Sequence, residues 1–235
     1  AVSLRGAQGR GGLTRKQQLR RVIRHTLRHL GMNEAVTYSL TSPQWEKGLS
    51  LHPDARPIPL VMPISDERSV LRTGLLPHLI QSAAYNVHRR QERVALFEIG
   101  AIYVAKEESL TDLPEERWEL AGLWTGPMEP VHWRGVTASD FYRVKGILES
   151  LFARLGIERV EFRPAQPKGF HPGRTAKIRI DGRFAGIYGQ LHPRLTDGMD
   201  LKETFAFQLD LDVLMDAARR DFLFRPIPRY PASTR

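Results

Sequence analysis

The sequence contains no cysteine and no long apolar run. Without cysteine there is no disulfide framework and no thiolate metal site, so any chemistry must rest on other groups. No stretch approaches the roughly 20 apolar residues that are needed to cross a bilayer. The N-terminal stretch AVSLRGAQGRGG also lacks the apolar middle of a secretory signal. We therefore expect a soluble, cytoplasmic protein without a membrane partner.

Several motifs of enzymes are missing as well. Neither GxxxxGK[ST] nor GxGxxG occurs, which argues against P-loop and Rossmann nucleotide binding. His25 and His29 have the spacing of a zinc-binding helix, but Thr26 replaces the glutamate of that motif, so we predict no metal site. His171 and His192 each precede a proline and are interpreted as turn residues, with substrate contact or metal binding as the alternatives.

Positive charge is in excess. Lysine and arginine number 35 against 26 acidic residues, which gives a net charge of +9 and favours an anionic partner, with RNA as the first candidate. The polar side of the first predicted helix carries six cations and no acidic residue: Arg15, Lys16, Arg20, Arg21, Arg24 and Arg28. They are candidates for contact with RNA phosphates or with an acidic partner subunit, and a solvated face is an equal alternative.

Hydrophobic periodicity predicts the elements. A capping box at Thr14 and Gln17 opens a helix that ends at Gly31, and further helices are expected at 75–89, 140–156 and 212–220. Strands are expected at 34–40, 58–63, 94–105, 117–126, 158–164, 176–182, 183–191 and 203–211, with a short turn or helix from His192. Strands in runs with helices between them favour an antiparallel sheet that is covered by helices.

Two carboxylates close the last of these strands. If the strand continues to residue 212, the side chains of Asp210 and Asp212 point to the same side and could form an acid/base pair. Ordinary charges at a sheet edge are the alternative interpretation.

Longer stretches carry a family signal. In chain order they are LTRKQQLRRVIRHTLRHLGMNEAVTYSL, PISDERSVLRTGLLPHL, YNVHRR, LFEIGAIY, ELAGL, DFYRVKG, FHPGRTA, GIYGQLHP and FQLDLDVL. Together they resemble the β subunits of phenylalanyl-tRNA synthetases, in their class II synthetase-like module. The resemblance implies an α+β fold with a class II aminoacyl-tRNA synthetase-like antiparallel β-sheet flanked by helices. It also implies a linker from an upstream domain at 1–13, a non-catalytic core at 14–221 and the start of a truncated C-terminal anticodon-binding domain at 222–235.

The same resemblance implies a degenerate active site. A catalytic class II core places two arginines on the phosphates of ATP, where positive charge stabilises the transition state. The corresponding signature positions hold other residues here: Val104 and Lys106 in the second signature, and Gln208, Asp210, Asp212 and Val213 in the third. We therefore predict that this chain has no catalytic residue and no cofactor, and that ATP and Mg²⁺ serve only the whole enzyme.

The implied role is assembly. The resemblance implies that the first helix and the strand that follows it form the first class II signature and contact the catalytic α subunit of an α2β2 enzyme. The residue-level interface candidates are the apolar residues of the helix: Leu19, Val22, Ile23, Leu27 and Leu30. The module would support ATP-dependent attachment of phenylalanine to its tRNA and link the editing and anticodon domains. The alternatives are a stand-alone basic RNA-binding domain, or an active ATP-using class II-like enzyme that draws its arginines from Arg89, Arg90 or Arg93.

Overall fold

A computed structural model of the chain describes residues 11–45, 49–105, 113–129, 133, 135 and 137–219. Residues 11–14 have no regular secondary structure. Most of the expected linker, the signature position Lys106 and the expected C-terminal segment at 222–235 lie outside the described residues.

The predicted helices are present, and their ends follow from local sequence. α1 (Arg15–His29) starts at a capping box formed by Thr14 and Gln17, and the chain turns at Gly31 with a φ of 88°. α2 (Leu76–His88) has a proline in its first turn, and the side chain of Asp140 caps α3 (Phe141–Arg154). Two shorter helices, α4 (Pro193–Thr196) and α5 (Leu211–Ala217), follow the last strands.

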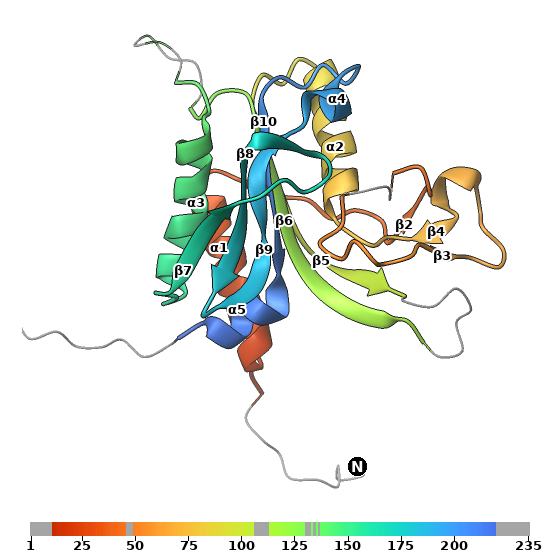
Figure 1. Cartoon of the computed structure of the whole chain (residues 1–235), viewed down its shortest axis with the longest axis horizontal. Helices are drawn as coiled ribbons and strands as arrows, with labels where there is room; N and C mark the ends of the chain where they lie inside the picture. The colour runs from red at the N-terminus through yellow and green to blue at the C-terminus, as the bar shows by residue number, and fades with distance from the viewer. Residues whose placement is uncertain are drawn as a thin grey trace, which may run out of the picture.

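A seven-stranded sheet forms the centre of the molecule (Figure 1). Its order is β1 (Asn33–Glu34), β5 (Val94–Val104), β6 (Glu115–Thr125), β10 (Thr204–Asp210), β9 (Arg183–Leu191), β8 (Phe170–Ile180) and β7 (Val160–Pro164). All neighbouring pairs are antiparallel except β1 with β5. The expected hairpin is formed by β5 and β6, and β8 begins at Phe170 rather than at residue 176, ahead of a shift in its register with β9. The prediction of a mostly antiparallel sheet is confirmed.

The prediction of one strand over residues 34–40 is wrong. Only Glu34 in β1 and Leu40 in β2 (Leu40–Thr41) are in strands, and β2 belongs to a second, small sheet with β4 (Val70–Leu71) and β3 (Ile58–Pro59). Between these ends, side chains take the place of a partner strand. The amide of Thr37 donates to Glu98 Oε1 (3.2 Å), and the guanidinium of Arg72 donates to the carbonyl of Tyr38 (3.4 Å). The run 58–63 is likewise a strand only at its first two residues, and a 3₁₀ turn, η1 (Asp66–Arg68), follows it.

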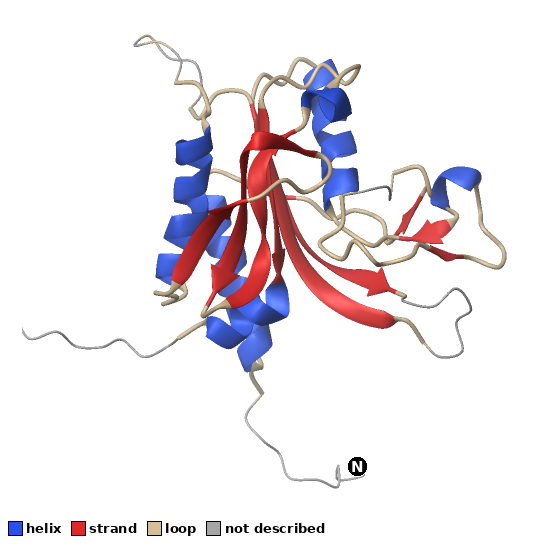
Figure 2. Ribbon diagram, in the orientation of Figure 1, coloured by secondary structure: helices blue, strands red, loops and turns tan. Residues whose placement is uncertain are grey.

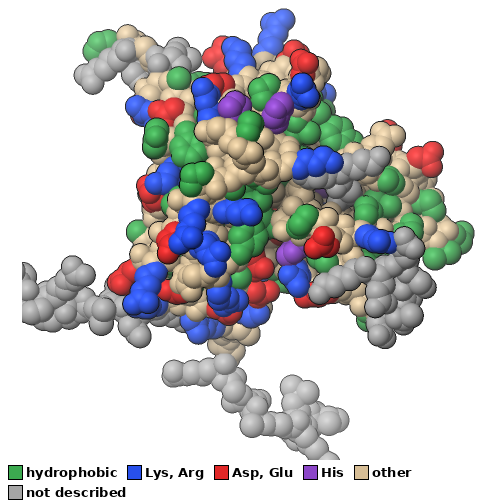
Figure 3. Space-filling view, in the orientation of Figure 1, with side chains coloured by type: hydrophobic (Ala, Val, Ile, Leu, Met, Phe, Trp, Pro, Cys, Tyr) green, Lys and Arg blue, Asp and Glu red, His purple; other side chains and the backbone are tan. Residues whose placement is uncertain are grey.

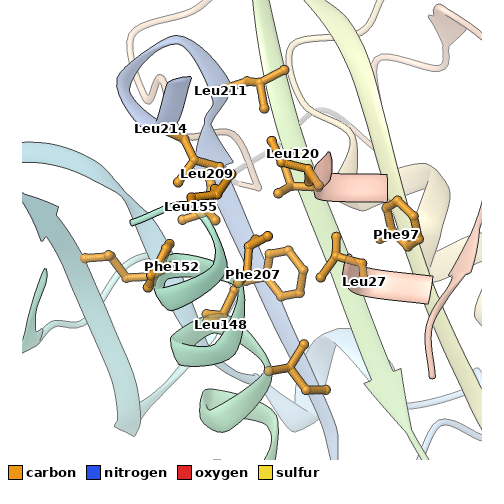
Figure 4. Close-up of a cluster of buried hydrophobic side chains, with 14 of the residues drawn as sticks. Leu27, Phe97, Leu120, Leu148, Phe152, Leu155, Phe207, Leu209, Leu211 and Leu214 are labelled. Atoms are coloured by element: carbon orange, nitrogen blue, oxygen red, sulfur yellow. The ribbon is translucent and has the colours of Figure 1, made fainter. Parts of the chain in front are cut away.

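Helices cover both faces of the large sheet. α1 and α3 lie on one face and α2 on the other (Figure 2). Because side chains alternate along a strand, Phe97, Leu120 and Phe207 pack toward α1 and α3 (Figure 4), and their neighbours point to α2. Burial of each such large side chain contributes about 1.5–3 kcal/mol. Apolar packing on the α1/α3 face therefore contributes more to stability than apolar packing on the α2 face.

Candidate functional site

Gln208 lies buried on the α2 face of the sheet, in the middle of β10. Its Nε2 donates to the carbonyl of Leu49 (2.7 Å) and to Glu119 Oε1 (3.3 Å), and its side chain is 1% exposed. Glu119 Oε1 also accepts from the amide of Leu75 (3.2 Å). The segment that carries Leu49 therefore lies against the strand position at which the family resemblance expects a small residue.

An ion pair is buried two strands away from this amide, because Glu98 in β5 and Gln208 in β10 both pair with Ala121 of β6. Arg72 Nη1 lies 2.9 Å from Glu98 Oε1, and the side chains are only 4% and 3% exposed. The same guanidinium donates through Nε to the carbonyl of Ala101 (2.8 Å). A Cβ added at Gly100 would lie 2.5 Å from Arg72 Nη2, so the absence of a side chain there lets the arginine reach the sheet. We call Arg72, Glu98, Glu119 and Gln208 the polar cluster.

Asp210 and Asp212 do not form a pair on a strand, because β10 ends at Asp210. Asp210 Oδ1 accepts from the amide of Val213 (3.0 Å) and so caps α5. Asp212 lies in α5 and pairs with Lys16 Nζ at 2.9 Å. Both carboxylates therefore have structural partners, which removes the geometric basis for the acid/base interpretation.

The two valines at the expected arginine positions face different parts of the core. Val104 packs in the cluster around α2, and Val213 packs in the cluster around α1 and α3. Val104 pairs with Glu115 at the end of the β5–β6 hairpin, while Asp210 pairs with Glu119. Four residues of β6 separate these points, which is about 13 Å at 3.3 Å per residue. The structure does not bring Val104 and Val213 together.

The apolar stripe of α1 is used within the chain. Leu19, Ile23 and Leu27 are buried against α3 and the sheet, and Val22 and Leu30 pack at the edge of the same cluster. Since these side chains already have an apolar environment, their pattern by itself gives no need for a second subunit.

The cations of α1 are distributed over several internal partners. Arg24 pairs with Glu34 at 2.6 Å, and Arg15 donates to the carbonyl of Ala218 at 3.0 Å. Arg20 lies over the ring of Trp118, and Lys16 pairs with Asp212 as described above. Arg21 and Arg28 line a hollow of about 320 Å³ beside the helix. Lys and Arg side chains on the face in Figure 3 are also mixed with acidic ones.

The histidines act as local hydrogen-bond partners. The Nδ1 atoms of His171 and His192 accept from the amides of Gly173 and Arg194, both at 3.1 Å. His171 lies near the start of β8 rather than in a turn, and His192 is the N-cap of α4. His29 Nδ1 lies 2.6 Å from the carbonyl of His25. Among the described residues, no three His, Asp or Glu side chains gather in a way that suits a metal ion.

An apolar surface outside the named interface candidates lies around the small sheet. Five large apolar side chains there are 62% to 99% exposed: Val36, Tyr38, Val61, Met62 and Ile64. In Figure 3, hydrophobic side chains also gather over this part of the molecule. We call these five residues the apolar rim. The run 58–63 contains only apolar residues and proline, which predicted a short strand and gave no sign that Val61, Met62 and Ile64 would be exposed.

A cleft of about 1040 Å³ adjoins the rim, lined by residues 36–45, 66–69 and the first half of α2. His78 on its wall is partly buried, and this burial together with the nearby charge of Arg72 lowers the pKa of the imidazole below 6.5. Thr41, which is 1% exposed, lies on the same wall.

Comparison with models of protein families identifies the family to which the chain belongs. Residues 2–211 match the model of the phenylalanyl tRNA synthetase beta chain CLM domain. The chain belongs to this family. It is 47% identical over 233 residues to the phenylalanine–tRNA ligase beta subunit of Halalkalibacterium halodurans, covering 98% of this chain and 29% of the relative. It is 45% identical over 227 residues to that of Geobacillus kaustophilus, covering 96% of this chain and 28% of the relative. The chain thus spans less than a third of the length of these relatives.

Solved structures agree on the fold of this beta-chain module. A pyrrolysyl-tRNA synthetase from Desulfitobacterium hafniense superposes with a TM-score of 0.63 at 16% identity, over 86% of this chain and 70% of that one. A second structure of that enzyme gives 0.62 at 17% identity, over 85% and 68%. The class II synthetase-like fold is thereby confirmed. Within the described part of the chain, every helix is too short or too polar to span a membrane.

At the positions that the family resemblance aligns with the third signature, the residues present do not fit the phosphates of ATP. The amide of Gln208 is bound to Leu49 and Glu119, where a nucleotide would need open space. Asp210 would repel a triphosphate, and Val213 has no charge to offer it. The only guanidinium of the polar cluster, on Arg72, is already neutralised by Glu98.

Proposed function

We propose that this chain is the non-catalytic core of a phenylalanine–tRNA ligase beta subunit. In this proposal it supports ATP-dependent attachment of phenylalanine to tRNA by assembling with the catalytic alpha subunit. ATP and Mg²⁺ then serve the alpha subunit in an α2β2 enzyme in the cytoplasm, and this module connects the editing and anticodon domains. Family membership and the occupied polar cluster support this reading.

The observation that carries the proposal is the apolar rim. Side chains such as Val61, Met62 and Ile64 are 87% to 99% exposed on consecutive or nearly consecutive residues. Contiguous apolar surface of this kind marks interaction sites in soluble proteins. The stripe of α1 is buried within the chain, so we move the expected contact with the alpha subunit from Leu19, Val22, Ile23, Leu27 and Leu30 to this rim.

The side chains that occupy the sheet face support the proposed lack of catalysis. Loss of one preorganised charge-stabilising donor lowers a rate by about 10²- to 10³-fold, and both expected arginines are replaced here. Hydrogen bonds of Gln208 also hold residue 49 against β10, which leaves the nucleotide no vacant surface at this position. Two of the three arginines of the alternative have partners away from the cluster, since Arg89 stacks on Tyr85 and Arg93 lies over Trp124 and donates to Gly31.

Contact with tRNA is a further part of the proposed function. Four of the six α1 cations have partners within the chain, which leaves Arg21 and Arg28 as the best candidates for phosphate contact. If both arginines contact phosphates, their loss would reduce the slope of log tRNA affinity against log salt concentration by about 2. An unchanged slope in the Arg21→Ala, Arg28→Ala variant would assign tRNA contact to other parts of the enzyme.

Binding of the alpha subunit tests the assembly proposal. The full natural chain that carries this sequence is mixed with alpha, and the dissociation constant is measured for wild type and for Met62→Asp, Ile64→Asp. We expect the charged variant to bind at least about 100-fold more weakly, since interface hot spots contribute about 2 kcal/mol or more each. The matched control is Leu13→Asp, which changes an exposed leucine remote from the rim in the same way. Equal affinity of all three proteins would refute the assignment of the rim.

A further inference from the structure

Thr37 lies between the rim and the buried ion pair. Its hydroxyl donates to Glu98 Oε2 (2.7 Å) and accepts from Arg72 Nη1 (3.0 Å). Its amide donates to Glu98 Oε1 (3.2 Å), and Glu98 in turn binds Arg72 at 2.9 Å. The three side chains form a closed ring of hydrogen bonds in which each donor has an acceptor.

The ring holds a segment that forms no strand of its own, although the amide of Ala35 donates to the carbonyl of Phe97 in β5 (2.7 Å). Residues 35–39 are outside every strand, and they join β1 to β2. Besides the ring, Arg72 binds the carbonyl of Tyr38 (3.4 Å), and its own amide donates to the carbonyl of Ser39 (3.0 Å). The residues on either side of Thr37 are Val36 and Tyr38, which are 89% and 62% exposed. One buried arginine thus fixes the main chain from which two residues of the apolar rim project.

We propose that Thr37 and Arg72 are positioning residues for docking of the alpha subunit. They hold the main chain of residues 35–39 on β5, so that Val36 and Tyr38 are presented in one conformation before the partner arrives. A segment that is ordered in advance loses less conformational entropy on binding, and this raises affinity without a new contact. The inference rests on the proposed function, since it deepens the account of the same surface.

Replacement of the hydroxyl tests this role with little change in shape. Thr37→Val removes both side-chain hydrogen bonds of Thr37, and we expect the full natural chain with this change to bind alpha about tenfold more weakly. Thr37→Ser keeps the hydroxyl and is expected to stay within about twofold of wild type. The matched control is Thr204→Val, because Thr204 is a buried threonine whose hydroxyl also donates a hydrogen bond, to the carbonyl of Lys202 at 2.9 Å.

A double-mutant cycle separates positioning from stability. In a background with Val36→Ala and Tyr38→Ala, the side chains that Thr37 positions are gone, so Thr37→Val should now weaken binding by less than about twofold. An equal tenfold loss in both backgrounds would show that Thr37 acts through the stability of the whole fold, and would overturn the inference.

The same titrations distinguish this inference from the proposed function. If wild type binds alpha but Thr37→Val binds equally well, the positioning role fails and the assembly proposal stands. If wild type itself does not bind alpha, both fail. Two results together support positioning. Thr37→Ser keeps the affinity for alpha, and Thr37→Val lowers it only when Val36 and Tyr38 are present.

Discussion

The two faces of the large sheet differ in the polarity of the side chains that they bury. The face under α1 and α3 is packed with apolar side chains such as Phe97, Phe152 and Phe207. The face under α2 is apolar around its edges. Its centre holds the polar cluster, with a buried guanidinium and two buried carboxylate side chains. A buried ion pair seldom adds stability over an apolar replacement, because desolvation opposes the attraction. The comparison indicates that one face secures the fold, while the other buries polar groups around Gln208, a position that the family resemblance aligns with the third signature.

Breaking the polar face should give the largest loss. Glu98→Gln leaves the buried charge of Arg72 without its counter-ion, and we expect the free energy of unfolding to fall by about 3–5 kcal/mol. The paired replacement Arg72→Met, Glu98→Leu removes both charges, and it should recover most of this loss. Urea denaturation of the three proteins measures the difference. A double variant as unstable as Glu98→Gln would show that the pair itself, and not an unpaired charge, matters.

The apolar face should respond by volume alone. Leu27 is fully buried, and Leu27→Ala should lower the free energy of unfolding by about 2–5 kcal/mol. Met62→Ala on the exposed rim should change it by less than about 0.5 kcal/mol. The contrast distinguishes the α1 stripe, as core, from the rim, as surface. If Leu27→Ala left the free energy of unfolding unchanged, the apolar stripe of α1 would again be a candidate interaction surface.

The end of β10 sharpens the comparison at smaller scale. If Asp210 serves as the N-cap of α5, Asp210→Ala should cost about 0.5–2 kcal/mol of stability, and Asp210→Ser or Asp210→Asn should restore most of it. Thermal unfolding of the three variants suffices as a measurement. Failure of both caps to restore stability would mean that the carboxylate has another role.

The smallest expected effect concerns pH. Burial lowers the pKa of His78 below 6.5, so the folded protein binds fewer protons there than the unfolded chain does. The stability from the neutral imidazole is fully present above the unfolded pKa and is lost as the pH falls through the folded pKa. His78→Gln should therefore lose less stability than wild type between about pH 7.5 and about pH 5.5. Arg72, Glu98 and Arg68 are the charges near this ring, so parallel curves would assign the pH dependence to them.

The helices and long strands could be predicted from sequence because their signals are local. The capping box of α1 and the largely apolar runs of β5, β6 and β10 depend on residues that are close together in the sequence. The break at residues 35–39 could not, because it depends on Arg72 and Glu98, which are distant in sequence. The partner that buries α1 could not be predicted for the same reason. An apolar stripe predicts burial, but not whether Leu27 is buried by α3 or by another chain.

Site positions were predictable only as residue types. The family resemblance identified Gln208, Asp210 and Val213 as unusual for a phosphate site. It did not show that the amide of Gln208 reaches Leu49, or that Val104 and Val213 lie in different clusters. Those facts require the register of β5, β6 and β10 in three dimensions.

The most direct test of the account is phenylalanine-dependent ATP–pyrophosphate exchange, measured on the full natural chain in the absence of the alpha subunit. We predict no exchange above background, and exchange at the enzyme's normal rate when alpha is added. Saturable exchange by the chain alone, lost when Arg89, Arg90 or Arg93 is replaced by alanine, would contradict the claim that chemistry belongs to the partner.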